Sequence, residues 1–196
     1  MEQYLDAQVK RFVQKQLFKK TYKVKTMLGL GGLHPEKYLE VLPEHKHCVL
    51  VDLYPVNNTV KLNSLIGEFD LLSINYNWWS PLNFVDCDFC KSILSNGYDL
   101  QYIYNKMKKS VTKNKYIAFT FCLRGVGEEK TIQWLANNFP ELNIPNCYTF
   151  VKDSRCDNLK SRQYVKRLWT GSEFLDIYRY RDSGENMISG IIQLNY

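Results

Sequence analysis

Short apolar runs alternate with segments of helical periodicity along this chain of 196 residues, and this alternation constrains the fold more than any single motif. Four apolar runs are predicted as buried strands: 25–30, 48–53, 69–74 and 116–123. Three amphipathic helices are predicted between or after them: 34–44, 98–110 and 128–139. Continuous apolar strands separated by helices form a mostly parallel sheet covered on both faces. The sequence therefore predicts an α/β fold.

The N-terminal segment adds a further helix. Apolar side chains in residues 2–20 recur at three- and four-residue spacings, which is typical of an amphipathic helix. No linker rich in Pro, Gly or Ser divides the chain, so we interpret residues 1–196 as one domain. The helical segment, residues 1–22, is expected to pack on or beside that domain and is a candidate contact for a protein partner.

The C-terminal part is predicted to differ from the rest. Two late strands are expected at 147–151 and 174–180, with no clear long helix between them. Such strands are expected to form an antiparallel pair at one edge of the sheet. The segment that separates them, 152–169, is predicted as a basic loop or a short helix.

Composition excludes several classes of protein. The hydrophobic fraction is 45% and the charged fraction 23%, so disorder is not expected to dominate. No apolar run has the roughly 18 residues of a membrane helix, and the polar N-terminus does not resemble a secretory signal. Six cysteines are too few for a disulfide scaffold in a chain of this length. A reducing, cytoplasmic location without membrane contact is therefore expected.

Charge is spread unevenly, although the net charge is +6. Acidic residues outnumber basic ones in residues 26–105, whereas basic residues are in excess in 1–25, 106–151 and 152–181. Basic clusters attract polyanions such as nucleic acids. Solvated lysines that only aid solubility are the simpler alternative for any single cluster.

Glycines and an acid follow the first two predicted strands. Gly29, Gly31 and Gly32 end the first strand, and Asp52 lies near the end of the second. Glycines at such a turn let the backbone approach a ligand closely, and an acid at the next strand accepts hydrogen bonds from ribose hydroxyls. A tight turn with a surface aspartate is the alternative interpretation. The pattern predicts a site for a nucleoside cofactor.

In this pattern, residues 23–181 resemble the class I S-adenosylmethionine-dependent methyltransferases, which have a Rossmann-like fold. The resemblance implies S-adenosylmethionine as cofactor. It implies cofactor-binding residues in four places: the glycine turn, Gly29, Leu30, Gly31 and Gly32; the ribose acid and its neighbour, Asp52 and Leu53; the adenine loop, Asn63, Ser64 and Leu65; and the transfer site, Asn75. It further implies Asn75, Tyr76 and Asn77 as catalytic residues, with Trp78 beside them.

The segment 75–81 (NYNWWSP) is the most unusual stretch of the chain. Trp78 and Trp79 are predicted to stack on a base of the substrate, while neighbouring amides read its edge. The stretch distantly resembles the motif of amino-methylating enzymes, although both of its prolines are missing. Burial of both tryptophans in the core is the alternative.

Methylation of a ribose 2′-oxygen is a second chemistry. It resembles a lysine, aspartate, lysine and glutamate set, in which a lysine assists removal of the hydroxyl proton. Lys20 or Lys23 would stand first and Glu173 last, as a catalytic residue. Asn75 occupies the place of the aspartate, and Arg124 is the base nearest to the second lysine position.

The C-terminal basic segment is predicted to bind the substrate, because basic residues interleaved with aromatic ones suit a nucleic-acid strand. The predicted substrate-binding residues, besides the two tryptophans, are Arg124, Lys152, Arg155, Arg162, Lys166 and Arg167. The lysines between 106 and 115 form another basic patch. We expect RNA as the partner ahead of DNA.

Other interpretations stay open. Cys87 and Cys90 have the spacing of half a zinc site, but structural zinc needs four ligands, so no metal is predicted. The sequence thus favours a methyltransferase acting on RNA, at the cap, a ribose or a base. A catalytically inactive methyltransferase-like fold that binds RNA or protein is the alternative. A nucleotide-binding oxidoreductase is a third hypothesis, against which the C-terminal strand pair argues.

Overall fold

The computed structural model describes residues 8–21, 26–30, 47–52, 60–61, 83–89, 91–109, 113–142, 144, 151–152, 166–172, 175–182 and 184–194. Its α-helices are α1 (Gln8–Phe18), α4 (Ile93–Lys109) and α5 (Glu128–Asn138), with short 3-10 turns at Lys19–Thr21 and Pro140–Leu142. Its strands are β1 (Thr26–Leu30), β2 (His47–Asp52), β3 (Val60–Lys61), β4 (Phe84–Asp88), β5 (Lys115–Cys122), β6 (Val151–Lys152), β7 (Lys166–Ser172), β8 (Leu175–Asp182) and β9 (Glu185–Leu194).

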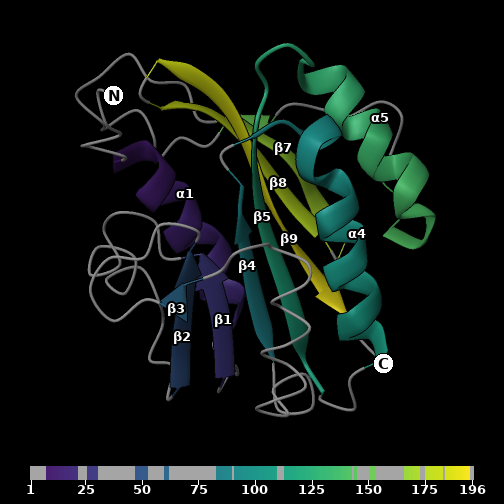
Figure 1. The fold of residues 1–196 in the computed structure, drawn as a ribbon. Coiled ribbons are helices and arrows are strands. Elements are labelled where there is room, and N and C mark those ends of the chain that lie inside the picture. The colour runs from purple at the N-terminus through teal and green to yellow at the C-terminus, as the bar shows by residue number, and fades with distance from the viewer. Residues whose placement is uncertain are drawn as a thin grey trace.

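The strands form one sheet in the order β3-β2-β1-β4-β5-β9-β8-β7-β6 (Figure 1). The first five strands in this order are parallel to one another. The remaining four extend the sheet through antiparallel ladders, beginning with β9 against β5. A parallel α/β sheet that reverses direction at one side confirms the predicted fold class.

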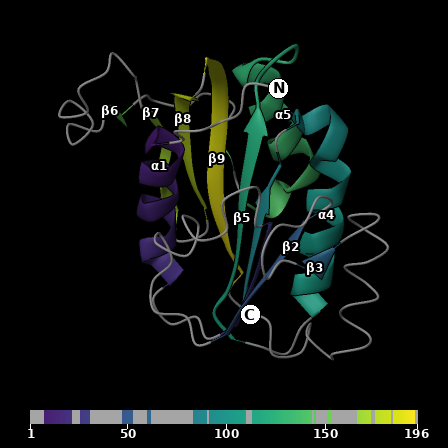
Figure 2. The ribbon, with the colours of Figure 1, turned by 60° about the vertical axis from the view of Figure 1, so that its left-hand side comes forward.

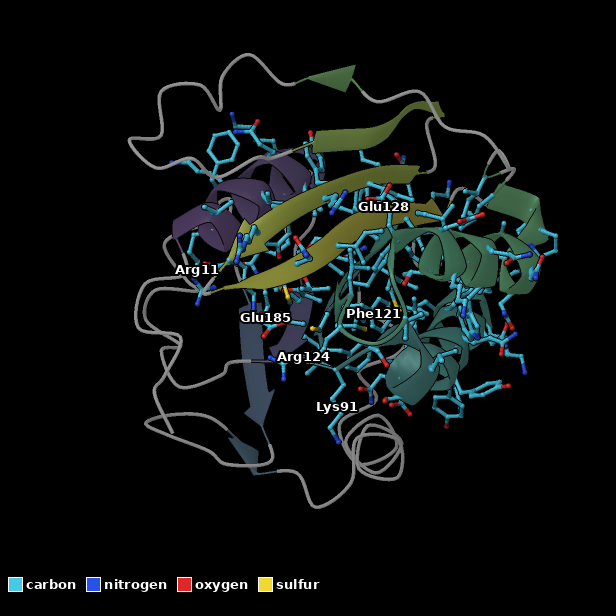
Figure 3. The ribbon with its side chains drawn as sticks, turned by 90° about the horizontal axis from the view of Figure 1, so that it is seen from above. Arg11, Lys91, Phe121, Arg124, Glu128 and Glu185 are labelled. Atoms are coloured by element: carbon cyan, nitrogen blue, oxygen red, sulfur yellow. The ribbon has the colours of Figure 1, made fainter. Side chains whose placement is uncertain are left out.

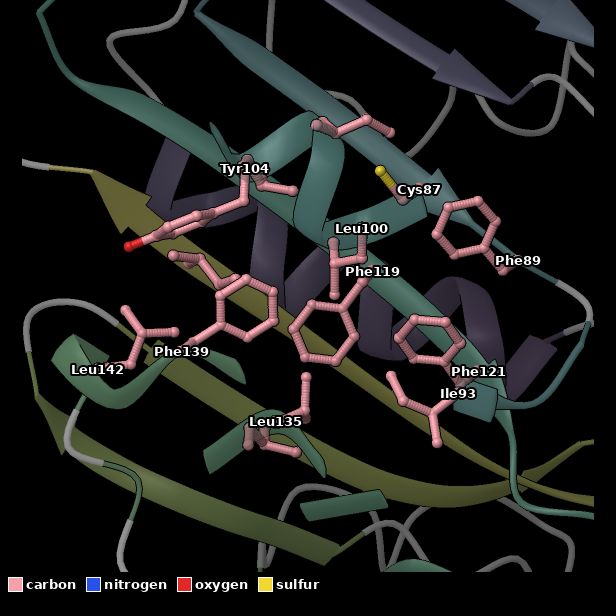
Figure 4. Close-up of a cluster of buried hydrophobic side chains, with 14 of the residues drawn as sticks. Cys87, Phe89, Ile93, Leu100, Tyr104, Phe119, Phe121, Leu135, Phe139 and Leu142 are labelled. Atoms are coloured by element: carbon pink, nitrogen blue, oxygen red, sulfur yellow. The ribbon is translucent and has the colours of Figure 1, made fainter. Parts of the chain in front are cut away.

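Helices lie on both faces of the sheet, with α1 on one side and α4 and α5 on the other (Figure 2). The larger core fills the space between the sheet and α4 and α5, where Phe119, Phe121, Leu100 and Phe139 are almost completely buried (Figure 4). A smaller core beneath α1 includes Val13 of that helix. Since β5 is buried over its whole length, it reads as a continuous apolar run in the sequence.

Helix α4 begins at Ile93, earlier than the predicted start at residue 98. Its first turns bury Ile93 and Gly97 in addition to the expected apolar positions. A β-carbon on Gly97 would lie 2.6 Å from the ring of Trp134, so glycine allows α4 and α5 to approach closely. Gly97 and the polar residues before it obscured the helix in the sequence pattern.

Four strands were not predicted: β3, β4, β7 and β9. The predicted antiparallel pair was wrong in its pairing, because β8 pairs with β9 and β6 pairs with β7. The prediction of a loop or short helix over 152–169 was wrong at its end, where β7 begins at Lys166. The predicted helix 34–44 and strand 69–74 lie outside the described residues.

Glu141 links the end of α5 to α4 and gives a pH-dependent contribution to stability. Burial raises the pKa of its carboxyl, but hydrogen bonds from Tyr104 (2.6 Å) and Lys108 (3.1 Å) outweigh burial, so the pKa lies below its ordinary value. A lowered pKa stabilises the fold above the ordinary value of 4.5, and this contribution disappears as the pH falls through the folded-state value.

We expect Glu141→Gln to lower the free energy of unfolding at pH 7 by about 0.5–1 kcal/mol, since the pair is partly exposed. The difference from the unsubstituted protein should shrink as the pH drops below about 4. Urea titrations at several pH values measure it. A difference that is constant with pH would show that the carboxylate charge contributes nothing.

Candidate functional site

The candidate site lies where the parallel strands end. Strands β1, β2, β4 and β5 run in the same direction, so their carboxyl ends share one edge of the sheet. Leu30 pairs with Val51, which places Asp52 one position beyond the end of β1 at this edge. In open α/β sheets, ligands bind at this edge, near the point where the strand order reverses. Here the reversal lies between β1 and β4.

A buried ion pair joins helix α1 to the end of β4. Lys10 Nζ lies 2.6 Å from Asp88 Oδ2, and the two side chains are 15% and 10% exposed. The other carboxylate oxygen of Asp88 is buried and has no hydrogen-bond partner in the described part of the chain. Asp88 therefore holds a buried acceptor near the point where the strand order reverses.

A chain of three hydroxyls continues from Asp88 across the same face of the sheet. Asp88 is in register with Thr120, and Thr120 with Ser189. The Ser189 hydroxyl lies 2.7 Å from that of Thr120 and 2.9 Å from that of Tyr180. Burial raises the pKa of Tyr180, which therefore stays protonated. The hydroxyl chain and the Lys10–Asp88 pair form one polar region beneath α1.

A second ion pair lies further out along the same edge. Arg124, just after β5, donates from Nε to Glu185 Oε2 at 3.1 Å, and its Nη2 makes a second contact with Oε1. The backbone N–H of Cys122 donates to the Lys91 carbonyl at 3.0 Å, which ties the loop after β4 to the end of β5. Viewed from above, Arg124 lies beside Glu185, and Lys91 extends from the same region (Figure 3).

A row of basic positions crosses the antiparallel strands. Lys152 of β6 is in register with Lys166 of β7, and Lys166 with Arg179 of β8. Arg179 is in register with Ile188, and Ile188 with Phe121, one position before the end of β5. The basic row therefore lies at the level of the carboxyl edge. Arg179 also contacts Glu128 of α5, at 2.9 Å.

Much of the predicted site falls outside the described residues. Of the predicted cofactor-binding positions, the structure describes the backbone of Gly29, Leu30 and Asp52, and it places them at one edge. Of the predicted substrate-binding positions, it describes Arg124 and the backbone of Lys152, Lys166 and Arg167. The predicted positions outside the described residues are Gly31, Gly32, Leu53, Asn63, Ser64, Leu65, Asn75, Tyr76, Asn77, Trp78, Trp79, Arg155, Arg162 and Glu173.

The predicted transfer site, Asn75 with Tyr76 and Asn77, lies outside the described residues and stays a prediction. Among the described strands, the one that pairs with β1 on the side away from β2 is β4. The residues at its carboxyl end are Asp88 and Phe89. Sequence reasoning therefore missed Asp88 and its partner Lys10. The alternation of valine and cysteine with acids in β4 (FVDCD) was the available signal.

Two of the lysines between 106 and 115, Lys108 and Lys115, are engaged within the protein, whereas Lys109 and Lys113 are exposed. Lys115 is 1% exposed and donates from Nζ to the Lys108 carbonyl at 3.2 Å. Burial lowers the pKa of Lys115. Lys108 pairs with Glu141 at 3.1 Å. These residues lie at the end of α4 and the start of β5, at the sheet edge opposite the candidate site.

The thiols of Cys87 and Cys122 pack in the protein interior. Cys87 and Cys122 are free and buried, and burial raises the pKa of Cys87 well above its usual value. No cluster of three or more metal-ligating side chains occurs among the described residues. None of the helices in that part of the chain has the length and apolar character needed to span a membrane.

No protein-family profile and no curated protein sequence matches this chain. Solved structures do share its architecture. A candidate SAM-dependent methyltransferase from Streptococcus mutans superposes with a TM-score of 0.51 and 12% identity, over 93% of this chain and 48% of that one. The chain has the fold of a class I methyltransferase.

Two further structures cover most of both chains. The N-methyltransferase NodS from Bradyrhizobium japonicum gives a TM-score of 0.48 and 12% identity over 97% of this chain and 99% of its own. An O-methyltransferase from Bacillus cereus, in complex with SAH, gives a TM-score of 0.47 and 11% identity over 96% and 83%. The chain spans about half the length of the S. mutans protein.

Proposed function

We propose that this methyltransferase-like chain binds S-adenosylmethionine and transfers its methyl group to nucleic acid, RNA ahead of DNA. The observation that carries the proposal is the register of β1 and β2, which brings Gly29 and Asp52 to the same carboxyl edge beside the reversal of strand order. That edge is where this fold class binds ligands.

The described residues fit the cofactor. A glycine near the end of β1 permits close approach of the backbone, and an acid at the end of β2 accepts hydrogen bonds from ribose hydroxyls. Gly29 and Asp52 would therefore hold the cofactor. When bound, S-adenosylmethionine supplies a methyl group that is already activated by its sulfonium.

The chain's own contribution to transfer is orientation of the substrate. The second oxygen of Asp88 is buried, and a displacement of the side chains that cover it would let it accept a hydrogen bond from a substrate N–H or O–H and so align the attacking atom. Lys10 holds the other oxygen, which fixes the carboxylate. This lysine–aspartate pair favours oxygen methylation, such as that of a ribose, over base methylation, because it supplies a cation beside a hydroxyl that must lose its proton.

The basic row supports a polyanionic substrate. Lys152, Lys166 and Arg179 occupy adjacent positions across three strands at the level of the carboxyl edge. Phosphates bound along this row would lead toward Arg124 and the end of β5. Affinity for RNA is expected to fall steeply with added salt, since bound phosphates release counterions.

Asp52→Ala is expected to weaken S-adenosylmethionine binding by about 1–3 kcal/mol, because a hydrogen-bond acceptor for the ribose is lost. Titration calorimetry with S-adenosylmethionine and S-adenosylhomocysteine measures the affinity. Glu129→Ala, at an exposed position of α5, removes a carboxylate that is not among the predicted cofactor-binding residues and serves as the control.

Equal affinities for the Asp52→Ala and unsubstituted proteins would remove Asp52 from the site. Absence of binding by the unsubstituted protein would refute the proposed cofactor. Tight cofactor binding without transfer of a labelled methyl group to RNA, DNA or protein would favour the inactive, substrate-binding alternative.

A further inference from the structure

The outer face of helix α4 carries exposed aromatic and apolar side chains. Leu94 and Tyr98 are 62% and 69% exposed, and they are the exposed large hydrophobic side chains among the described residues. Tyr102 follows one turn later and is half-buried. Since residues four apart lie on one side of a helix, Leu94 and Tyr98 form an exposed stripe that continues to Tyr102, which also packs against the larger core. Tyr98 is held edge-on against Trp134, with ring centroids 6.0 Å apart.

Lysines flank this stripe. Lys91 is exposed just before the helix, and Lys109 and Lys113 are exposed at its far end. Lys106 Nζ lies 5.3 Å from the centre of the Tyr102 ring. The only acid within α4 is Asp99, which accepts a hydrogen bond from Asn96 at 2.6 Å. The α4 outer face, defined as Lys91, Leu94, Tyr98, Tyr102, Lys109 and Lys113, is therefore aromatic and positively charged.

This face begins at the candidate site. Lys91 lies in the loop after β4, and its carbonyl accepts the hydrogen bond from Cys122 at the end of β5. From there the helix runs down the sheet to its opposite edge (Figure 1). With 17 residues, α4 is about 25 Å long. A strand that leaves the carboxyl edge would meet the aromatic residues first and the lysines at the far end.

The charge of the face selects its occupant. A second copy of the chain packed through the same face would oppose lysines to lysines, which is unfavourable. Single-stranded nucleic acid offers phosphates for the lysines and base faces for the exposed tyrosine, a combination typical of strand-tracking surfaces. We propose that the α4 outer face binds single-stranded RNA and guides it to the carboxyl edge. This proposal rests on the proposed nucleic-acid substrate.

Tyr98→Ala is expected to weaken binding of a fluorescently labelled poly(U) oligonucleotide by about 5- to 50-fold, because a stacking surface is lost. Tyr98→Phe keeps the ring and should bind as the unsubstituted chain does. Lys109→Gln should lower the slope of log affinity against log salt by about 1, whereas Lys15→Gln, at an exposed position on α1, should leave it unchanged. Fluorescence anisotropy at several salt concentrations measures all four variants.

Unchanged poly(U) affinity in a folded Tyr98→Ala protein would overturn the proposal, and thermal unfolding verifies the fold. Equal losses for duplex RNA would also overturn it, because paired bases offer no free faces for stacking. Displacement of poly(U) by polyglutamate at equal charge concentration would point to an acidic protein instead. Calorimetry with S-adenosylmethionine does not depend on RNA binding. A negative poly(U) result would therefore contradict the RNA surface on α4 and leave the cofactor proposal to be tested separately.

Discussion

Asp88→Ala is expected to lower the free energy of unfolding by about 3–5 kcal/mol, because it removes the carboxylate that pairs with the largely buried Lys10 ammonium. The two side chains are only 15% and 10% exposed, so water screens the remaining charge poorly. Chemical denaturation followed by circular dichroism measures the loss. The same substitution removes the contact that joins α1 to the end of β4.

The matched control removes both charges. Lys10→Met combined with Asp88→Leu replaces the pair by apolar groups, and replacements of this kind are often close to neutral in stability. We therefore expect the double variant to be more stable than Asp88→Ala. A double variant whose loss equals the sum of the single losses would show that the two side chains are not coupled.

Asp88 also has a functional readout. Asp88→Asn keeps the shape but loses the charge, and it should reduce the rate of methyl transfer by about 100-fold if the carboxylate receives a proton or a hydrogen bond from the nucleophile. Affinity for S-adenosylmethionine should stay the same, since Asp52 and the glycine turn lie on other strands. Transfer at the unsubstituted rate would limit Asp88 to a structural role.

Strands buried on both faces could be predicted from the sequence, and strands with one polar face could not. The segment β5 is a continuous apolar run, because Phe119 packs in the core beneath α4 and α5 while Ala118 packs in the core beneath α1. In β4, Asp86 and Asp88 point to the α1 face while Val85 and Cys87 point to the larger core. The acids interrupted the apolar pattern, so β4, the strand that pairs with β1 and β5 at the centre of the parallel sheet, was not predicted.

The candidate site itself depends on contacts between distant parts of the chain. Lys10 and Asp88 lie far apart in the sequence, and neither stands in a motif. The glycine turn and Asp52 were predicted as site residues because they lie at the ends of two predicted strands. Only the order of strands in the sheet shows that β4 follows β1, and no local pattern in the sequence carries that order.

Strand β9 was not predicted for a different reason. Its glycine, Gly190, is also the position where a substitution is expected to destabilise the fold strongly. Ser189 and Gly190 break the apolar run of the C-terminal strand. Gly190 is in register with Phe119 on one side and Ile177 on the other. A β-carbon at Gly190 would lie 2.5 Å from Phe119 Cζ and 2.8 Å from the backbone oxygen of Asp176. The large ring of Phe119 thus occupies the space that the glycine leaves open.

Gly190→Val is therefore expected to destabilise the fold by about 3 kcal/mol or more, because the backbone oxygen of Asp176 has no freedom to move away. Asn186→Val, at an exposed position of the same strand, introduces valine without the contacts that a side chain at Gly190 would make, and it should change the free energy of unfolding by less than about 0.5 kcal/mol.

Combining Gly190→Val with Phe119→Ala removes the ring but keeps the contact with the backbone oxygen of Asp176. The loss of stability in the double variant should therefore be smaller than the sum of the two single losses. Additive losses in urea unfolding would contradict the packing of Phe119 over Gly190, and with it the position of β9 against β5 that completes the sheet.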